Sequence, residues 1–237
     1  MSAAGDMLGW KMIYLARRNP ALAPEQFPQA WREHSALGAG CTNVRDKVRS
    51  VTQCSRLLEG PALPGAATDY DGVNLLELRD LQAATDIWSD AETLAIMRPD
   101  EPRVFSTYVR EFTLVCEEQV LRDWPRSRTC LVGFLRRRRD LGSAQWKLRL
   151  MQTAPASWMT SGAFAGAGRV VHNAVHLPPP PGYEYDSICE WWFDSADEAR
   201  EAIGARDVRE HLPPALAQLA ELPRSVFMFT QVTHSRP

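Results

Sequence analysis

The chain has 237 residues, of which 45% are hydrophobic and 24% are charged, and its formal net charge is -2. This length suits one large domain or two ordinary ones, and the composition is that of a globular protein. The small net charge provides no general attraction to nucleic acid or to an anionic membrane, and no apolar run is long enough to cross one. Residues 1–6 lack the basic and apolar regions of a secretory signal, so we expect a cytoplasmic protein.

Two segments near the start of each half of the chain resemble one another. Residues 11–18 have the sequence KMIYLARR, and residues 130–137 have the sequence CLVGFLRR. Both are β-type runs that end in a pair of arginines. Each is followed by a turn and then by helical periodicity, over residues 24–37 and 143–153 respectively. Such an echo predicts an internal repeat.

A second pair of segments strengthens the repeat. Residues 69–78 (DYDGVNLLEL) and 184–193 (EYDSICEWWF) both carry Tyr-Asp, a small residue and a strand-like run. Helical patterns follow over residues 81–97 and from residue 195 onward, and β-rich segments close each half at 104–120 and 225–234. With second strands at 44–58 and 169–177, each half has the order β-α-β-β-α-β of a ferredoxin-like unit.

The boundary between the halves is predicted within residues 121–128, where Asp123, Pro125 and Arg126 interrupt the apolar pattern. We therefore expect two units, 1–124 and 125–237, with long loops at 60–68 and 178–182. The predicted fold class is α+β: two fused ferredoxin-like units form an intramolecular barrel, their sheets face to face and helices outside. The chain is then a monomeric pseudo-dimer, or it forms a homodimer.

Residues 11–37 resemble the start of EthD-like proteins. The features are an apolar strand that ends in Arg17, then Phe27, then Trp31 and His34 in the sequence W-R-E-H. The Tyr-Asp-Gly element at residues 70–72, ahead of a strand, is similar as well. Less similar copies of these units recur in the second half.

This resemblance implies a tandem, two-copy member of the dimeric α+β barrel superfamily, with a small-molecule cavity between its sheets. The superfamily includes cofactor-independent monooxygenases, cyclases, dehydratases, lyases, haem-binding enzymes and members without known activity. It therefore implies a fold without selecting a reaction.

His34 is the first candidate for catalysis, because an imidazole titrates near neutral pH and suits acid–base chemistry. It shares a helical stripe with Phe27, Trp31 and Leu37, so it should face protein. The alternative is a core histidine that makes one hydrogen bond. The resemblance, whose motif includes a histidine at this position, gives the functional interpretation the same weight as this alternative. The second copy carries Thr153, which cannot titrate, at the matching position.

Tyr70 and Asp71 are the other catalytic candidates. Tyr70 would donate to a developing oxyanion, and a buried Asp71 would act as a base or orient an imidazole. The alternative is that Asp71 bonds to the local backbone at the turn into the strand. The second copy keeps Tyr185-Asp186 but not the helix histidine, which favours a structural Asp71.

The predicted substrate-binding residues lie on strands and on the first helix: Trp31, Arg17, His172, His176 and Trp192. His172 and His176 should share one strand face about 13 Å apart, too far to bind one metal. Arg17 either binds a substrate carboxylate or phenolate or belongs to a solvated turn. Trp192 and its neighbour Trp191 should point to opposite faces.

Two acidic residues, Glu77 and Glu190, lie in the same predicted strands as these aromatics. Each is a candidate acid if its side chain points inward, which the sequence does not decide because a shift of one residue reverses the face.

The sequence lacks the nucleotide-binding, zinc-protease and serine-hydrolase motifs, and its five scattered cysteines have no metal-site spacing. We therefore expect buried thiols, no metal and no cofactor. The predicted function is cofactor-independent acid–base chemistry on a hydrophobic aromatic or polyketide-like molecule, of the lyase, dehydratase, cyclase or isomerase type. The alternatives are a cofactor-free monooxygenase on a phenolic substrate, a haem-binding barrel enzyme and a non-catalytic binding protein.

Overall fold

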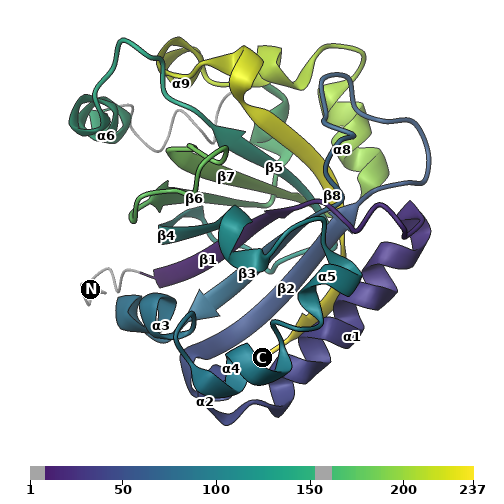
Figure 1. The fold of residues 1–237 in the computed structure, drawn as a ribbon. Helices are drawn as coiled ribbons and strands as arrows, with labels where there is room; N and C mark the ends of the chain where they lie inside the picture. Colours follow the sequence, from purple (N-terminus) through teal and green to yellow (C-terminus); the bar gives the residue numbers. More distant parts are fainter. Residues whose placement is uncertain (1–8, 153–161) are drawn as a thin grey trace, which may run out of the picture.

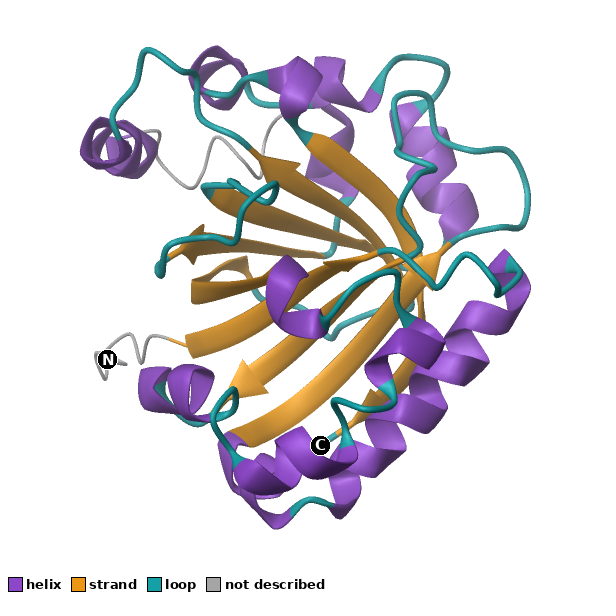
Figure 2. Ribbon diagram, in the orientation of Figure 1, coloured by secondary structure: helices purple, strands orange, loops and turns teal. Residues whose placement is uncertain are grey.

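A closed barrel of eight antiparallel strands forms the centre of the molecule (Figures 1 and 2). The computed structural model describes residues 9–152 and 162–237. The strands of the first half are β1 (Gly9–Ala16), β2 (Val48–Arg56), β3 (Gly72–Leu78) and β4 (Thr113–Arg122). Those of the second half are β5 (Thr129–Leu135), β6 (Arg169–Val175), β7 (Ser187–Phe193) and β8 (Val226–Arg236).

The two halves have the same strand order. Around the barrel the strands follow β1-β3-β2-β8-β5-β7-β6-β4. The first half is thus ordered β4-β1-β3-β2 and the second half β8-β5-β7-β6. The halves join along two antiparallel edges, β2 with β8 and β4 with β6. This closure gives every strand a partner on both sides and leaves no open edge.

Helices cover the barrel on opposite sides, with those of each half packed outside their own strands (Figure 1). The first half contributes α1 (Phe27–Gly40), α2 (Thr42–Lys47), α3 (Leu81–Asp86), α4 (Ala91–Ile96) and α5 (Glu101–Val104). The second half contributes α6 (Ser143–Gln152), α8 (Ala196–Ile203) and α9 (Pro214–Leu219). Within the described ranges, none of the helices has the length and apolar character needed to cross a membrane.

Several helices start where the sequence supplies a capping side chain. Asp80 accepts a hydrogen bond from the Ala83 amide at 2.8 Å, and Ser195 accepts one from the Glu198 amide at 3.1 Å. These caps satisfy amides that have no partner within the helix. Asp90 caps α4 in the same way, so the helical pattern predicted over residues 81–97 is divided between α3 and α4.

Matching contacts lie at the ends of β1 and β5. The Arg18 amide donates to Asp71 at 3.0 Å, and the Arg137 amide donates to Asp186 at 2.9 Å. In both pairs the guanidinium of the same arginine also binds the carboxylate. The preceding arginines lie over tyrosine rings, with Arg17 3.9 Å from the Tyr70 centroid and Arg136 4.5 Å from the Tyr185 centroid.

The interior of the barrel is filled by side chains and contains a buried ionic cluster. Lys11, which is fully buried, donates to Glu190 at 2.8 Å and lies 2.7 Å from Glu118. Burial opposes the charge of Lys11, but Glu190 and Glu118 outweigh it and raise its pKa. Glu190 also accepts hydrogen bonds from Asn173 and from the indole of Trp192, both at 2.9 Å. The cluster links the two halves, because Lys11 and Glu190 come from different ones.

Two further expectations drawn from the sequence differ from the structure. The strand expected within residues 44–58 spans Val48–Arg56, because the short helix α2 occupies residues 42–47. The space expected between the sheets is occupied by the packed interior just described. The expectation that helices lie outside the sheets is met, and all five cysteines are buried and free.

Candidate functional site

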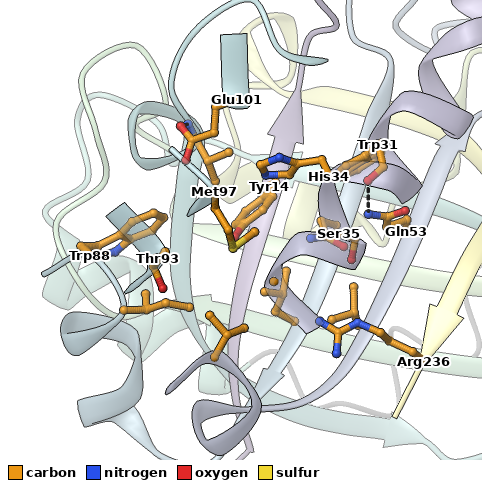
Figure 3. A pocket seen from close by; sticks show the side chains of 17 residues that line it. Tyr14, Trp31, His34, Ser35, Gln53, Trp88, Thr93, Met97, Glu101 and Arg236 are labelled. Atoms are coloured by element: carbon orange, nitrogen blue, oxygen red, sulfur yellow. Dashed lines mark hydrogen bonds between the residues drawn. The ribbon is translucent and has the colours of Figure 1, made fainter. Parts of the chain in front are cut away.

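A cavity of about 60 Å³ lies between the outer face of the first-half strands and helices α1 to α5 (Figure 3). Side chains alternate along a strand, so Tyr14 of β1 points toward this cavity while Lys11 points into the barrel. Most of the wall is apolar. The apolar lining consists of Trp31, Gly38, Val44, Val51, Leu76, Ile87, Trp88, Met97 and Val109.

Polar side chains reach the same cavity from seven different elements. They are Tyr14, His34, Ser35, Gln53, Asn74, Thr93, Glu101 and Arg236. Four of them have a buried polar atom without a hydrogen-bond partner among the described residues: Gln53 Oε1, Asn74 Oδ1, Thr93 Oγ1 and Arg236 Nε. Buried polar atoms are almost always paired in folded proteins, with protein, ligand or ordered water, so this cluster of unpaired ones makes the cavity the candidate ligand site.

His34 lies on the buried face of α1, and its side chain is held on two sides. Its Nδ1 lies 2.9 Å from Oδ2 of Asp100, which immediately precedes α5. The ring of Phe105 packs edge-on against the imidazole, with centroids 5.5 Å apart and planes at 90°. Arg103 in turn donates to Asp100 at 2.7 and 3.1 Å. The histidine is thus fixed in orientation by a carboxylate that is itself fixed.

These contacts define the protonation state of the pair. Burial lowers the pKa of His34 below its usual 6.5, although Asp100 opposes this effect. The hydrogen bonds from Arg103, together with His34, hold the pKa of Asp100 below its usual value. Near pH 7 the imidazole is therefore neutral and the carboxylate is ionised. An ionised carboxylate only accepts hydrogen bonds, so Nδ1 carries the proton and Nε2 keeps its lone pair.

Two further groups in the cavity have raised pKa values. Burial raises the pKa of Glu101, whose carboxylate also accepts a hydrogen bond from the Val109 amide at 2.9 Å. Burial, and next to it Glu101, raises the pKa of Tyr14 above its usual value. Tyr14 therefore stays a neutral donor at neutral pH. Figure 3 shows Tyr14, Glu101 and His34 at the same end of the cavity.

Two of the residues predicted from the sequence, Trp31 and His34, line this cavity. Trp31 lies so close to β3 that a Cβ at Gly72 would come within 2.4 Å of its ring. The glycine of the Tyr-Asp-Gly element therefore makes room for this tryptophan.

Three other predicted residues lie at one end of the first-half strands, outside the cavity lining. Arg17 stacks on Tyr70 and donates to the Asp69 backbone carbonyl at 3.0 Å. Asp71 binds Arg18 and lies 3.4 Å from the guanidinium of Arg56. Each charge is satisfied within this cluster, which ties β1, β2 and the turn before β3 together.

The remaining predicted residues lie in the second half or in the barrel interior. His172 is buried, its Nε2 lies 3.0 Å from the Ser187 hydroxyl, and burial lowers its pKa to about 4. His176 follows β6 and packs edge-on against Trp10 at 4.9 Å. Trp192 points into the barrel beside Glu190, whereas Trp191 packs among the second-half helices. Their opposite faces are those expected for neighbours in a strand.

Sequence reasoning missed Tyr14, Asp100 and Glu101. Tyr14 belongs to a predicted strand, but the face it occupies depends on the register. Asp100 lies in the turn R-P-D-E-P, which has neither periodicity nor a motif. An acidic pair between two prolines in a helical region was the one available signal for a constrained turn.

The described residues offer little support for a bound metal or haem. They contain no cluster of three or more His, Cys, Asp or Glu side chains able to hold a metal ion. The cavity at His34 is far smaller than a porphyrin, and one ring nitrogen of His34 is already hydrogen-bonded to Asp100. The ring of His172 is engaged with Ser187. These histidines do not fit the role of haem ligand as they are placed.

No protein-family model matches this sequence, and no curated protein matches it significantly. Solved structures do match. An anthrone oxidase-like protein is similar over 100% of this chain and 95% of its own, with a TM-score of 0.62 and 13% identity. A protein provisionally named as a monooxygenase, from Fusobacterium nucleatum, is similar over 98% of this chain and 95% of its own, with a TM-score of 0.56 and 7% identity. At such identities the likeness shows a fold of the dimeric α+β barrel type.

Proposed function

We propose that this protein is a cofactor-independent enzyme that removes a proton from a hydrophobic aromatic or polyketide-like molecule bound in the first-half cavity. The observation that carries the proposal is the pairing of His34 with Asp100 at 2.9 Å on the wall of that cavity. A neutral imidazole oriented by a carboxylate is a competent general base near pH 7. The unpaired polar atoms around the same space support ligand binding there.

Each polar group is given a role that follows from its protonation state. His34 accepts the proton at Nε2, and Asp100 positions it and stabilises the imidazolium that forms. Tyr14 donates a hydrogen bond to the oxyanion that develops on the substrate. Glu101, whose pKa is raised by burial, is suited to return a proton. Tyr70, Asp71 and Arg17 are assigned a structural role at the strand ends.

Removal of a proton from a carbon of the substrate leaves a carbanion, and two reaction outcomes start from it. If a proton returns at another atom, or a leaving group departs, the enzyme is an isomerase, a dehydratase, a lyase or a cyclase. If the carbanion reacts with molecular oxygen, an activated CH₂ becomes C=O and the second oxygen atom leaves as water. The names of the two similar structures, anthrone oxidase-like and monooxygenase, favour testing this oxygen-dependent outcome as the second candidate.

We further propose that the chain is an EthD-like tandem of two ferredoxin-like units, residues 1–124 and 125–237. The identical strand orders and the matched Arg–Asp and Arg–Tyr contacts support this division. The proposed boundary falls in the segment between β4 and β5. The halves share one barrel, so each unit would depend on the other for its closed edges.

Access to the cavity requires movement, because about 60 Å³ accommodates only a few water molecules. A larger open groove of about 860 Å³ adjoins it and is lined by Arg110, Leu177 and the prolines of the 178–182 loop. Trp88 lines both spaces. We propose that the groove is the entrance and that displacement of Trp88 joins it to the cavity.

The proposal is tested by screening anthrones, phenols and small polyketides while following both product formation and oxygen uptake. A turnover that His34→Ala abolishes supports the proposal, and oxygen uptake then decides between the two outcomes. Full turnover by His34→Ala would refute it.

A further inference from the structure

Arg236 is the one cavity residue supplied by the second half of the chain. It lies in β8, which pairs with β2 across the seam of the barrel, and Arg236 is directly opposite Val51 in that ladder. Val51 belongs to the apolar wall of the first-half cavity. The register between β2 and β8 therefore places a guanidinium of the second half in the candidate site of the first half. Figure 3 shows it at the end of the cavity away from Glu101.

The guanidinium has no counterion within the described part of the chain. Ion pairs are found for Arg17, Arg18, Arg56 and Arg126, whereas no carboxylate comes within 4 Å of Arg236. Its Nε is buried without a hydrogen-bond partner. Burial lowers the pKa of Arg236, and no acidic neighbour offsets that effect. A partly buried cation without a partner is costly, which indicates that its partner is a ligand.

A second cation, Arg32, lies near His234 at the same end of the cavity. Burial lowers the pKa of His234, with smaller contributions in the same direction from Arg236 and Arg32. Arg236 and Arg32 thus both lie close enough to His234 to lower its pKa. His34 is neutral and Asp100 is bound to Arg103, so neither neutralises Arg236.

We infer that Arg236 binds the carboxylate of the substrate, and that the substrate is consequently a planar hydrophobic acid rather than a neutral molecule. A guanidinium presents two parallel N–H groups that match the two oxygens of a carboxylate. The apolar walls formed by Trp31, Leu76 and Trp88 accommodate the hydrophobic part. The acid would then be anchored at one end of the cavity, with His34 and Tyr14 facing its reactive carbon.

This inference rests on the proposed function only in placing the ligand in the same cavity, and it does not require turnover. Benzoate and benzamide serve as probes, because they have nearly the same shape and differ in charge. Their dissociation constants are measured by calorimetry near pH 7.5, where histidines with lowered pKa values are neutral. Wild type is expected to bind benzoate at least about tenfold more tightly than benzamide, the gain of a charge-assisted bidentate contact.

Variants separate the role of Arg236 from the general positive charge and from catalysis. Arg236→Gln should bind the two probes equally, whereas Arg32→Gln, which removes an exposed cation outside the cavity lining, should retain the preference. His34→Ala should also retain it, so failure of the acid–base proposal would leave this result unchanged. The unliganded Arg236→Gln protein should melt no lower than wild type, because Arg236 forms no ion pair with the described residues and its Nε has no hydrogen-bond partner among them.

Three results would overturn the inference. They are equal binding of both probes by wild type, a preference for benzoate that survives Arg236→Gln, and a large loss of thermal stability in the unliganded variant, which would make Arg236 structural.

Discussion

The two halves of this barrel have the same strand order and matched contacts, but they use the space outside their strands differently. In the first half that space is a cavity with a histidine, a tyrosine and a raised-pKa carboxyl group on its wall. In the second half the corresponding space is occupied by aromatic rings. Phe164 stacks on Trp191 with centroids 4.2 Å apart and planes at 15°.

Register identifies the substitutions behind this difference. Met12 pairs with Leu76, and the equivalent Leu131 pairs with Trp191, so a tryptophan replaces a cavity-lining leucine. Tyr14 corresponds in the same way to Gly133, where a Cβ would lie 2.9 Å from the Phe227 ring. The larger rings leave no room for a side chain at Gly133. The position matching His34, Thr153, lies outside the described residues.

The second-half residue that matches Asp100 also differs between the two halves. Arg18 forms a bridge to Phe105 and Arg137 forms one to Ala220, so these bridges align the segments before them. Counting back equally from each bridge places Ala215 opposite Asp100. Where the first half has the His34–Asp100 pair, the second half thus has Ala215 at the position of Asp100, beside a packed core. One copy stabilises the barrel, and the other is free to keep the unpaired polar groups that a ligand site requires.

The largest expected effect is the loss of turnover in His34→Ala. Removal of a general base should lower kcat by about 10² to 10⁴-fold. His176→Ala is the matched control, because it removes a half-exposed histidine outside the cavity and should leave kcat unchanged. Equal losses in both variants would contradict a special role for the first-half cavity.

Phe164→Ala should affect stability instead of activity. Deleting a fully buried aromatic ring of the second half should lower the free energy of unfolding by about 3–5 kcal/mol. Denaturant unfolding measures this loss. Below the melting temperature, kcat of the variant should match that of wild type, and a large fall in kcat would show that the halves are not functionally separate.

Leu76→Trp copies the second-half residue into the first half. The larger ring should occupy the cavity and abolish ligand binding, while overpacking should cost about 1–3 kcal/mol of stability. Calorimetry with benzoate and thermal melting measure the two effects. Ligand binding at wild-type affinity would place the site elsewhere.

The smallest expected effect is the pH dependence of stability that His34 contributes. Its pKa is lower in the folded protein than in the unfolded chain, so the unfolded state takes up protons first as the pH falls below about 6.5. The contribution of His34 to the free energy of unfolding is therefore fully present above pH 6.5. It is lost as the pH falls from 6.5 to the lower pKa of the folded state. His172, with a pKa of about 4, contributes in the same direction. The contribution of His34 is measured as the difference in the pH dependence of the unfolding free energy between wild type and His34→Gln. If the two proteins show the same pH dependence, the pKa of His34 is not shifted by folding.

The similar strands of the two halves and the position of His34 on a buried helical face could be predicted because both depend on local patterns. Periodicity placed Trp31 and His34 on one stripe, and the strand echoes defined the β-α-β-β-α-β order. The alternation of Trp191 and Trp192 likewise followed from strand geometry alone.

The rest of the site depends on contacts between distant segments. Asp100 reaches His34 from a turn without periodicity, and the inward or outward direction of Tyr14 is decided by a register that one residue would reverse. Arg236 reaches the cavity only because β8 pairs with β2 when the barrel closes. The sequence resemblance directed attention to Tyr70 and Asp71, which are satisfied by neighbouring arginines at the strand ends.

The central claim, that a neutral His34 presents Nε2 to the cavity while Nδ1 donates to Asp100, is tested most directly by nitrogen NMR of ¹⁵N-histidine-labelled protein. The resonances of His34 are assigned by their disappearance in His34→Gln. We predict the Nδ1-protonated tautomer near pH 7, a titration midpoint below 6.5, and loss of this tautomer preference in Asp100→Asn. An Nε2-protonated ring, or an imidazolium that persists at pH 7, would contradict the assignment of His34 as the base.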